Sequence, residues 1–146
     1  CSLSAVRQYR SRVSGPLLDR LDLHVEVPPV DFEDLNRAQK SECSADIRSR
    51  VNRARGIQQA RYQGSGVTCN ANLTPDLLHT VCQMTEKAKA LLKTAFDRLG
   101  LSARAYDRVL KVARTIADLE GAEVIDTGHI LEAVQFRSLD RKYWQA

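Results

Sequence analysis

The sequence has 146 residues, of which 43% are hydrophobic and 5% aromatic, and its formal net charge is +4. This length is enough for one domain with a buried core, and the shortage of aromatic residues predicts a core of Leu, Val, Ile and Ala, which suits helices packed on helices. No apolar run approaches the ~18 residues that a membrane span needs, so we expect neither a transmembrane protein nor a membrane partner. The modest positive charge permits contact with nucleotides or nucleic acid without requiring it.

The four cysteines show neither a CxxC pair nor the spacing of metal ligands among themselves. They are Cys1, Cys43, Cys69 and Cys82. Reduced thiols in the cytoplasm are therefore the expected state, and no metal site is expected from these residues. Position 1 is Cys rather than Met, and we expect the chain to be part of a longer protein.

The first expected helix covers residues 4–13 and ends at the Ser-Gly-Pro sequence of residues 14–16. Leu21, Leu23, Val25 and Val27 then alternate with polar residues, which is the period of a β-strand with one buried face. Two prolines at 28 and 29 end this strand, because proline cannot donate to a ladder. The other strands of its sheet would lie upstream, so we expect it to lack a partner sheet within these residues.

Two polar residues of this stretch are candidates for function. Arg20 stands where a helical turn runs into the strand, a place where a rigid scaffold can direct a side chain outward. A surface ion pair is the alternative for this arginine. His24 lies on the polar side of the expected strand, so we expect it at the surface or at an interface rather than as a ligand.

The rest of the chain reads as helical after a connection over residues 28–42. Apolar residues repeat at helical spacing, with Ser, Thr or Pro at the starts and Gly at two of the ends. Gly100 and Gly121 are the expected ends, and Ser44, Thr74, Ser102 and Thr127 are the expected caps. The expected helices cover residues 44–62, 75–81, 84–99 and 102–120, and a last helix begins at Thr127.

The helix over 44–62 carries five arginines, and no acidic residue lies between Asp46 and Asp76. These are Arg48, Arg50, Arg53, Arg55 and Arg61. They flank the apolar stripe of the helix on both sides. A solvated helix face and a surface that meets DNA or a neighbouring subunit remain open alternatives.

Arg104 lies in the first turn of the helix over 102–120. A cation is unfavourable there, because the helix dipole places partial positive charge at that end. An anion close to Arg104 would explain the charge. Arg108, one turn further, is the second candidate for the same role.

Two motifs carry a family resemblance. The first is SGPLLDRLDLHVEVP from residue 14, and the second is LSARAYDRVLKVARTIADLEG at 101–121. The first resembles the segment after sensor 1 in magnesium chelatase-like AAA+ ATPases of the ComM (YifB) type and, more distantly, a segment of the MCM helicases. The second is similar to the sensor 2 helix of the same families. The resemblance covers nearly the whole chain.

The resemblance implies a role for each arginine. Arg20 corresponds to the arginine finger, which reaches the nucleotide of the neighbouring subunit and stabilises charge on the γ-phosphate. Arg104 corresponds to the sensor 2 arginine, which contacts the phosphates of its own subunit's nucleotide, with Arg108 as the substitute. Cys1 resembles the last member of a short cysteine cluster whose other members would lie upstream.

The nucleotide-binding motifs themselves are missing from this sequence. It contains no G-x-x-x-x-G-K-[ST] and no apolar strand that ends in paired acids, so it offers neither a phosphate cradle nor a Mg²⁺ site. ATP and Mg²⁺ are expected in the intact protein, and this chain alone is expected to be inactive. The fold expected is mainly α: the last strand of an AAA+ core in residues 1–30, then a helical lid in residues 31–146.

The function implied by the resemblance is that of a hexameric motor. Such a homo-hexameric ring would use ATP for DNA remodelling or branch migration during recombination of incoming strands in natural transformation. Two alternatives remain. One is a chelatase-like remodeller that acts on a protein, and the other is a free-standing helical DNA-binding module that uses the five arginines.

Overall fold

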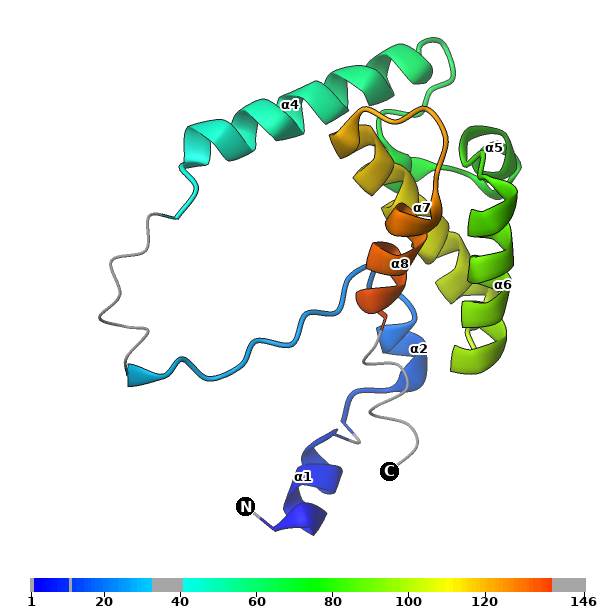
Figure 1. The fold of residues 1–146 in the computed structure, drawn as a ribbon. Coiled ribbons are helices and arrows are strands. Elements are labelled where there is room, and N and C mark those ends of the chain that lie inside the picture. Colours follow the sequence, from blue (N-terminus) through cyan, green and yellow to red (C-terminus); the bar gives the residue numbers. More distant parts are fainter. Residues whose placement is uncertain (1, 11, 33–40, 138–146) are drawn as a thin grey trace.

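The computed structural model describes residues 2–10, 12–32 and 41–137. Within these ranges the chain is mainly helical, which confirms the fold class expected from the sequence (Figure 1). None of the helices found there is long and apolar enough to cross a membrane.

The elements follow the order expected from the sequence. A first helix and a short second helix precede the extended segment, and the remaining helices form a bundle. The bounds are α1 (Leu3–Arg10), α2 (Gly15–Leu18), α4 (Ser44–Arg61), a 3-10 turn η1 (Asn70–Asn72), α5 (Pro75–Val81), α6 (Glu86–Leu99), α7 (Ala103–Glu120) and α8 (Thr127–Gln135).

The core of the bundle is built around α7, which contacts α4, η1, α5 and α8. Most of its apolar stripe is buried, because alanines among Val, Leu and Ile let the neighbouring helices approach closely; Leu119 near its end is exposed. Ser102 caps α7 by accepting a hydrogen bond from the Ala105 amide, and Gly121 ends it with φ at 77°. A left-handed residue at this position favours glycine, as the sequence predicts.

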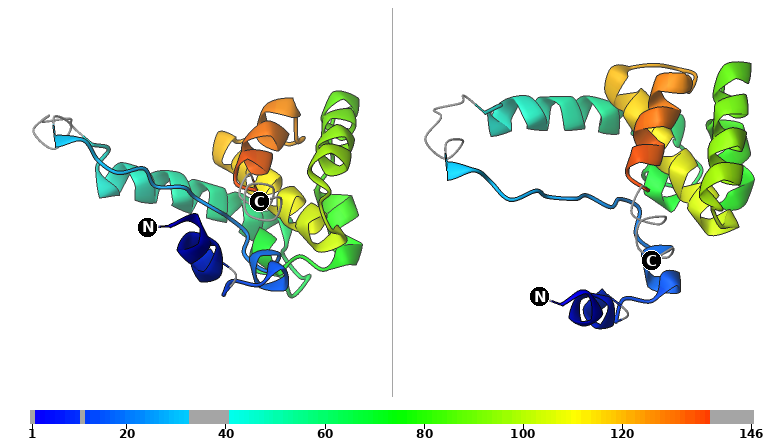
Figure 2. Two further views of the ribbon diagram at one scale, coloured as in Figure 1. Left: turned by 90° about the horizontal axis from the view of Figure 1, so that it is seen from below. Right: turned by 60° about the horizontal axis from the view of Figure 1, so that its bottom comes forward.

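The helix α4 runs away from the bundle (Figures 1 and 2). Its C-terminal half packs on α7 through Ala54 and Gln58. Further toward its start, Ile47 and Val51 continue the same stripe but are 42% and 43% exposed. Gly56 lies inside this helix and does not interrupt it.

Two predicted caps differ by one residue. Cys43 rather than Ser44 is the N-cap of α4, and its thiol donates to the Asp46 carboxylate over 3.0 Å. Asp126 rather than Thr127 caps α8, because it forms a capping box in which the His129 ring accepts from the Asp126 amide.

Residues 21–31 are extended but form no β-ladder with another described segment, so the expected β-strand is not formed here. Its apolar side chains stay in solvent, with Val25 64% and Val27 82% exposed. His24 is instead buried, with 6% exposed, which corrects its expected place at the surface. Its surroundings explain the burial: the His24 amide donates to the Phe136 carbonyl at the end of α8, and its Nε2 lies 3.2 Å from the Leu18 carbonyl oxygen.

Candidate functional site at the α2–α7 contact

Arg20 lies in the turn that follows α2. The Arg20 amide donates to the Leu17 carbonyl and the Leu21 amide to the Leu18 carbonyl, each over 3.0 Å, so the turn is a continuation of the helical hydrogen bonding. The Arg20 side chain is exposed. The backbone therefore fixes the base of this side chain while leaving its guanidinium in solvent.

The residues on either side of this turn contact the start of α7. The Asp19 carboxylate accepts a hydrogen bond from the Ser102 hydroxyl over 3.1 Å. Arg104, two residues beyond Ser102, is also exposed. The turn that carries Arg20 thus contacts the start of α7, where Arg104 lies, and no described carboxylate pairs with either guanidinium.

Arg108, the second candidate for a phosphate contact, is engaged within the chain. Its guanidinium forms an ion pair and hydrogen bond with the Asp22 carboxylate. Its side chain is 28% exposed. This contact fastens the extended segment to the polar flank of α7, so Arg108 is less available to a ligand than Arg104.

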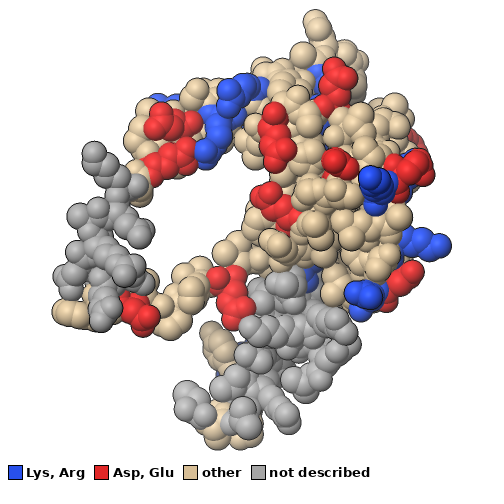
Figure 3. All heavy atoms as spheres, in the orientation of Figure 1, with Lys and Arg blue, Asp and Glu red and all other residues tan. Residues whose placement is uncertain are grey.

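The five arginines of α4 fall into two groups. Arg48, Arg53 and Arg55 are exposed, and within residues 2–10, 12–32 and 41–137 none of them has an ion-pair partner. Figure 3 shows basic side chains over this helix. Arg50 forms a bidentate pair with the exposed Glu42, with distances of 2.6 and 2.9 Å.

Arg61, the last of the five, belongs to a buried cluster that the sequence analysis missed. Both of its terminal nitrogens donate to the Asp118 carboxylate, over 2.9 and 2.5 Å. The Asp118 carboxylate also accepts a hydrogen bond from Arg114 over 3.1 Å and one from the side-chain amide of Asn70 over 2.8 Å. Tyr62 donates to Asn70 over 2.6 Å, which joins the end of α4 to η1 and α7.

The electrostatics of this cluster follow from the two arginines around one carboxylate. Burial alone would raise the pKa of Asp118, but the hydrogen bonds from Arg61 and Asn70 and the charge of Arg114 outweigh it and lower this pKa. The hydrogen bond to Asp118 raises the pKa of Arg61. One feature of the sequence could have indicated this cluster: Arg114 and Asp118 are four residues apart and lie among the buried residues of α7.

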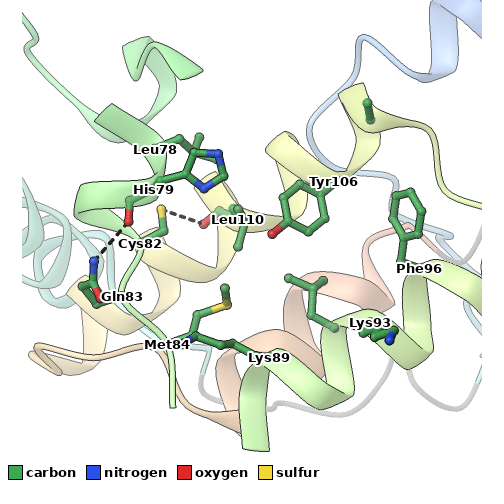
Figure 4. Close-up of a pocket in the computed structure, with 12 residues that line it drawn as sticks. Leu78, His79, Cys82, Gln83, Met84, Lys89, Lys93, Phe96, Tyr106 and Leu110 are labelled. Atoms are coloured by element: carbon green, nitrogen blue, oxygen red, sulfur yellow. Dashed lines mark hydrogen bonds between the residues drawn. The ribbon is translucent and has the colours of Figure 1, made fainter. Parts of the chain in front are cut away.

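A cavity of about 630 Å³ lies between α5, α6 and α7 (Figure 4). Its walls are largely apolar, with Lys89 and Lys93 on the α6 side. Burial raises the pKa of Cys82 to about 11, so this thiol is neutral at pH 7 and a poor nucleophile or metal ligand. Neither Arg20 nor Arg104 lines this cavity.

Metal binding finds no support in the described part of the chain. No three of its His, Cys, Asp and Glu residues gather as a metal site would require. Cys43, Cys69 and Cys82 are free thiols. Cys1, for which the resemblance implies a cysteine cluster, lies outside the described residues.

Comparison with known proteins finds magnesium chelatase-like sequence in two segments of the chain. Residues 41–137 match the family described as "Magnesium chelatase, subunit ChlI C-terminal", and residues 1–35 match "Magnesium chelatase, subunit ChlI". The chain is 40% identical over 137 residues to the competence protein ComM of Haemophilus influenzae, which covers 93% of this chain and 26% of that protein. It is 39% identical over 142 residues to the protein YifB of Salmonella typhimurium, which covers 97% of this chain and 27% of that protein.

The chain therefore spans about a quarter of the length of the curated relatives that it matches. The match over residues 41–137 takes in all of the bundle from α4 to α8, and the match over residues 1–35 takes in the turn that carries Arg20. From these matches, and from the helical bundle that they cover, the chain belongs to the magnesium chelatase ChlI-like family, in the branch that includes ComM and YifB.

Proposed function

We propose that this chain is the C-terminal part of a ComM-type AAA+ ATPase, in which Arg20 and Arg104 stabilise phosphate charge at the boundary between subunits of a homo-hexameric ring. The observation that carries this proposal is the contact between Asp19 and Ser102, beside which both arginines are exposed. A planar guanidinium suits the spread of negative charge over the phosphoryl oxygens in the transition state.

ATP and Mg²⁺ are the implied cofactors. Arg20 and Arg104 fit the phosphate oxygens, because both are exposed cations without a described ion-pair partner. The nucleotide would supply the transferred phosphoryl group, and the two arginines would hold it and balance its charge. The residues that cradle the phosphates and bind the metal would come from outside these 146 residues.

The isolated 146-residue chain should hydrolyse no ATP and bind it weakly. Its sequence contains no phosphate-cradling loop, and an arginine finger contributes to the transition state rather than to ground-state affinity. Titration calorimetry with MgATP and a phosphate-release assay test this. Micromolar ATP binding by the chain alone would contradict the proposed division of roles.

We further propose that the exposed arginines of α4 meet the DNA backbone in the intact motor. Arg48, Arg53 and Arg55 are exposed and carry three positive charges along α4. Each arginine that neutralises a phosphate releases condensed counterions, which makes affinity depend steeply on salt. Arg50 and Arg61 contribute less, because Glu42 and Asp118 already balance them.

Replacing Arg48, Arg53 and Arg55 by Gln should flatten the salt dependence of DNA binding by the intact protein. For three lost phosphate contacts, the slope of log K against log salt should fall by about 3 on duplex and about 2 on single strands. Fluorescence anisotropy between low and physiological salt measures it. The matched control removes three exposed cations from α6, by Lys87→Gln, Lys93→Gln and Arg98→Gln.

If the two triple variants gave equal slopes of log K against log salt, α4 would not contact DNA in the intact protein. That result would favour the remodeller that acts on a protein. Tight, salt-dependent DNA binding by the isolated chain, without nucleotide, would favour the free-standing DNA-binding module.

A further inference from the structure

The turn that carries Arg20 is held by the lid on several sides. Residues 19–24 contact α7 through the Asp19–Ser102 hydrogen bond and the Asp22–Arg108 pair. They contact the end of α8 through the bond from the His24 amide to the Phe136 carbonyl, which measures 2.9 Å. This segment is therefore attached to the lid helices at both of its ends.

Arg137 makes the most direct of these attachments. It follows α8, and its amide donates to the Val134 carbonyl over 2.9 Å, which continues the helical turn. Its side chain is 1% exposed. One terminal nitrogen donates to the Leu21 carbonyl over 2.5 Å, and the other lies 3.7 Å from the Asp19 carboxylate.

Asp19 and Leu21 are the residues immediately before and after Arg20. A single buried guanidinium thus contacts both neighbours of the exposed arginine. Arginine remains charged at all accessible pH values, and its planar fork fixes the direction of two contacts at once. Because a buried cation without such partners is strongly unfavourable, the bundle and the Arg20 turn are held together in one arrangement.

From this geometry we infer that Arg137 is a positioning residue for Arg20: it ties the turn that carries Arg20 to the end of α8, so that lid and turn move as one unit. The role for Arg20 rests on the proposed function, but the attachment itself does not. A change in lid orientation would therefore redirect Arg20, without any change at Arg20 itself.

The His24 amide reports this attachment by hydrogen exchange. In the unmodified chain it should exchange at least about tenfold more slowly than a solvent-exposed amide, because it donates to Phe136. In Arg137→Met this protection should fall by about tenfold or more, while the amides of α7 residues Ala113 and Ile116 keep theirs. Arg137→Lys, which keeps the charge but not the fork, should give an intermediate rate.

Two further variants keep the test decisive if Arg137→Met disturbs the bundle. Asp19→Asn combined with Asp22→Asn changes only the partly exposed turn and should accelerate His24 exchange in the same way. Arg98→Met removes an exposed arginine from the last turn of α6 and should change nothing. An unprotected His24 amide in the unmodified chain, or unchanged protection in both the Arg137 and the Asp19/Asp22 variants, would overturn the inference.

In the intact protein, Arg137→Met should lower the turnover number for ATP hydrolysis while leaving the Michaelis constant for ATP close to its original value. A purely structural loss would lower the yield of folded protein without this separation. If the intact protein showed no ATPase activity, the proposed function would fail, whereas the exchange result would stand by itself.

Discussion

Arg20→Ala in the intact protein should reduce ATP turnover by about 10³ to 10⁵, the range measured for arginine fingers. ATP binding should remain nearly unchanged, because the guanidinium acts on charge that develops in the transition state. Steady-state phosphate release and binding of a fluorescent ATP analogue measure the two quantities separately. Arg20→Lys should be almost as inactive, since an ammonium cannot reproduce the planar fork.

Arg98→Ala, which removes an exposed arginine from α6, is the matched control and should keep full activity. If Arg20→Ala weakened ATP binding as much as turnover, Arg20 would be a ground-state ligand and not an arginine finger.

Mixing experiments distinguish whether Arg20 and Arg104 serve one nucleotide or two. The family resemblance alone assigns Arg104 to its own subunit and Arg20 to the neighbour. The Asp19–Ser102 contact joins the turn that carries Arg20 to the start of α7, which carries Arg104, and this arrangement favours action on a single nucleotide. We therefore expect Arg20→Ala and Arg104→Ala subunits to respond alike when they are mixed with wild-type subunits. Rescue of Arg20→Ala alone would instead support separate nucleotides.

Asp118→Ala should destabilise the chain by about 3–5 kcal/mol, the usual cost of removing one partner from a buried ion pair. The side chains of Asp118 and Arg114 are 0% and 1% exposed, so the substitution leaves a buried cation without its carboxylate. Urea unfolding followed by circular dichroism measures the loss. Asp97→Ala removes an exposed acid from α6 and should change the free energy of unfolding by less than about 0.5 kcal/mol.

The pH dependence of stability provides a second measurement at Asp118. The pKa of this carboxyl is lower in the folded state than in the unfolded chain, so its contribution is complete above the unfolded pKa, near 3.9. The contribution is then lost as pH falls toward the folded pKa. Asp118→Asn should remove this part of the acid sensitivity. An unchanged slope below about pH 4 would mean that other carboxylates account for it.

The helices were predictable because each carries local signals. Ser102 and Gly121 mark the ends of α7, and its apolar stripe repeats at helical spacing, so the bounds and most of the buried face followed from the sequence. The same holds for Gly100 at the end of α6. One-residue errors at Cys43 and Asp126 arose where a neighbouring residue competed for the same cap.

The extended segment and the internal ion pairs depend on contacts between distant parts of the chain. Alternation predicted a buried apolar face for residues 21–27, but burial also needs a neighbouring strand, and no described segment supplies one. His24 is buried because Phe136, more than a hundred residues away, offers a carbonyl group. Arg61 looked like a member of a basic surface because its partner Asp118 is distant in sequence. The proposed roles of Arg20 and Arg104 stay predictions.

The anchoring of α4 at one end gives it the mechanics of a lever. Its C-terminal half is held by Ala54, Gln58 and the Arg61–Asp118 pair, and the first turns, with Ile47 and Val51 exposed, extend beyond the bundle. The segment 44–53, before the first buried contact at Ala54, spans about 15 Å at 1.5 Å per residue. A rotation of about 10° at this anchor would therefore move the start of the helix by about 3 Å, about half the rise of one helical turn. A small reorientation of the bundle would in this way displace the far end of α4.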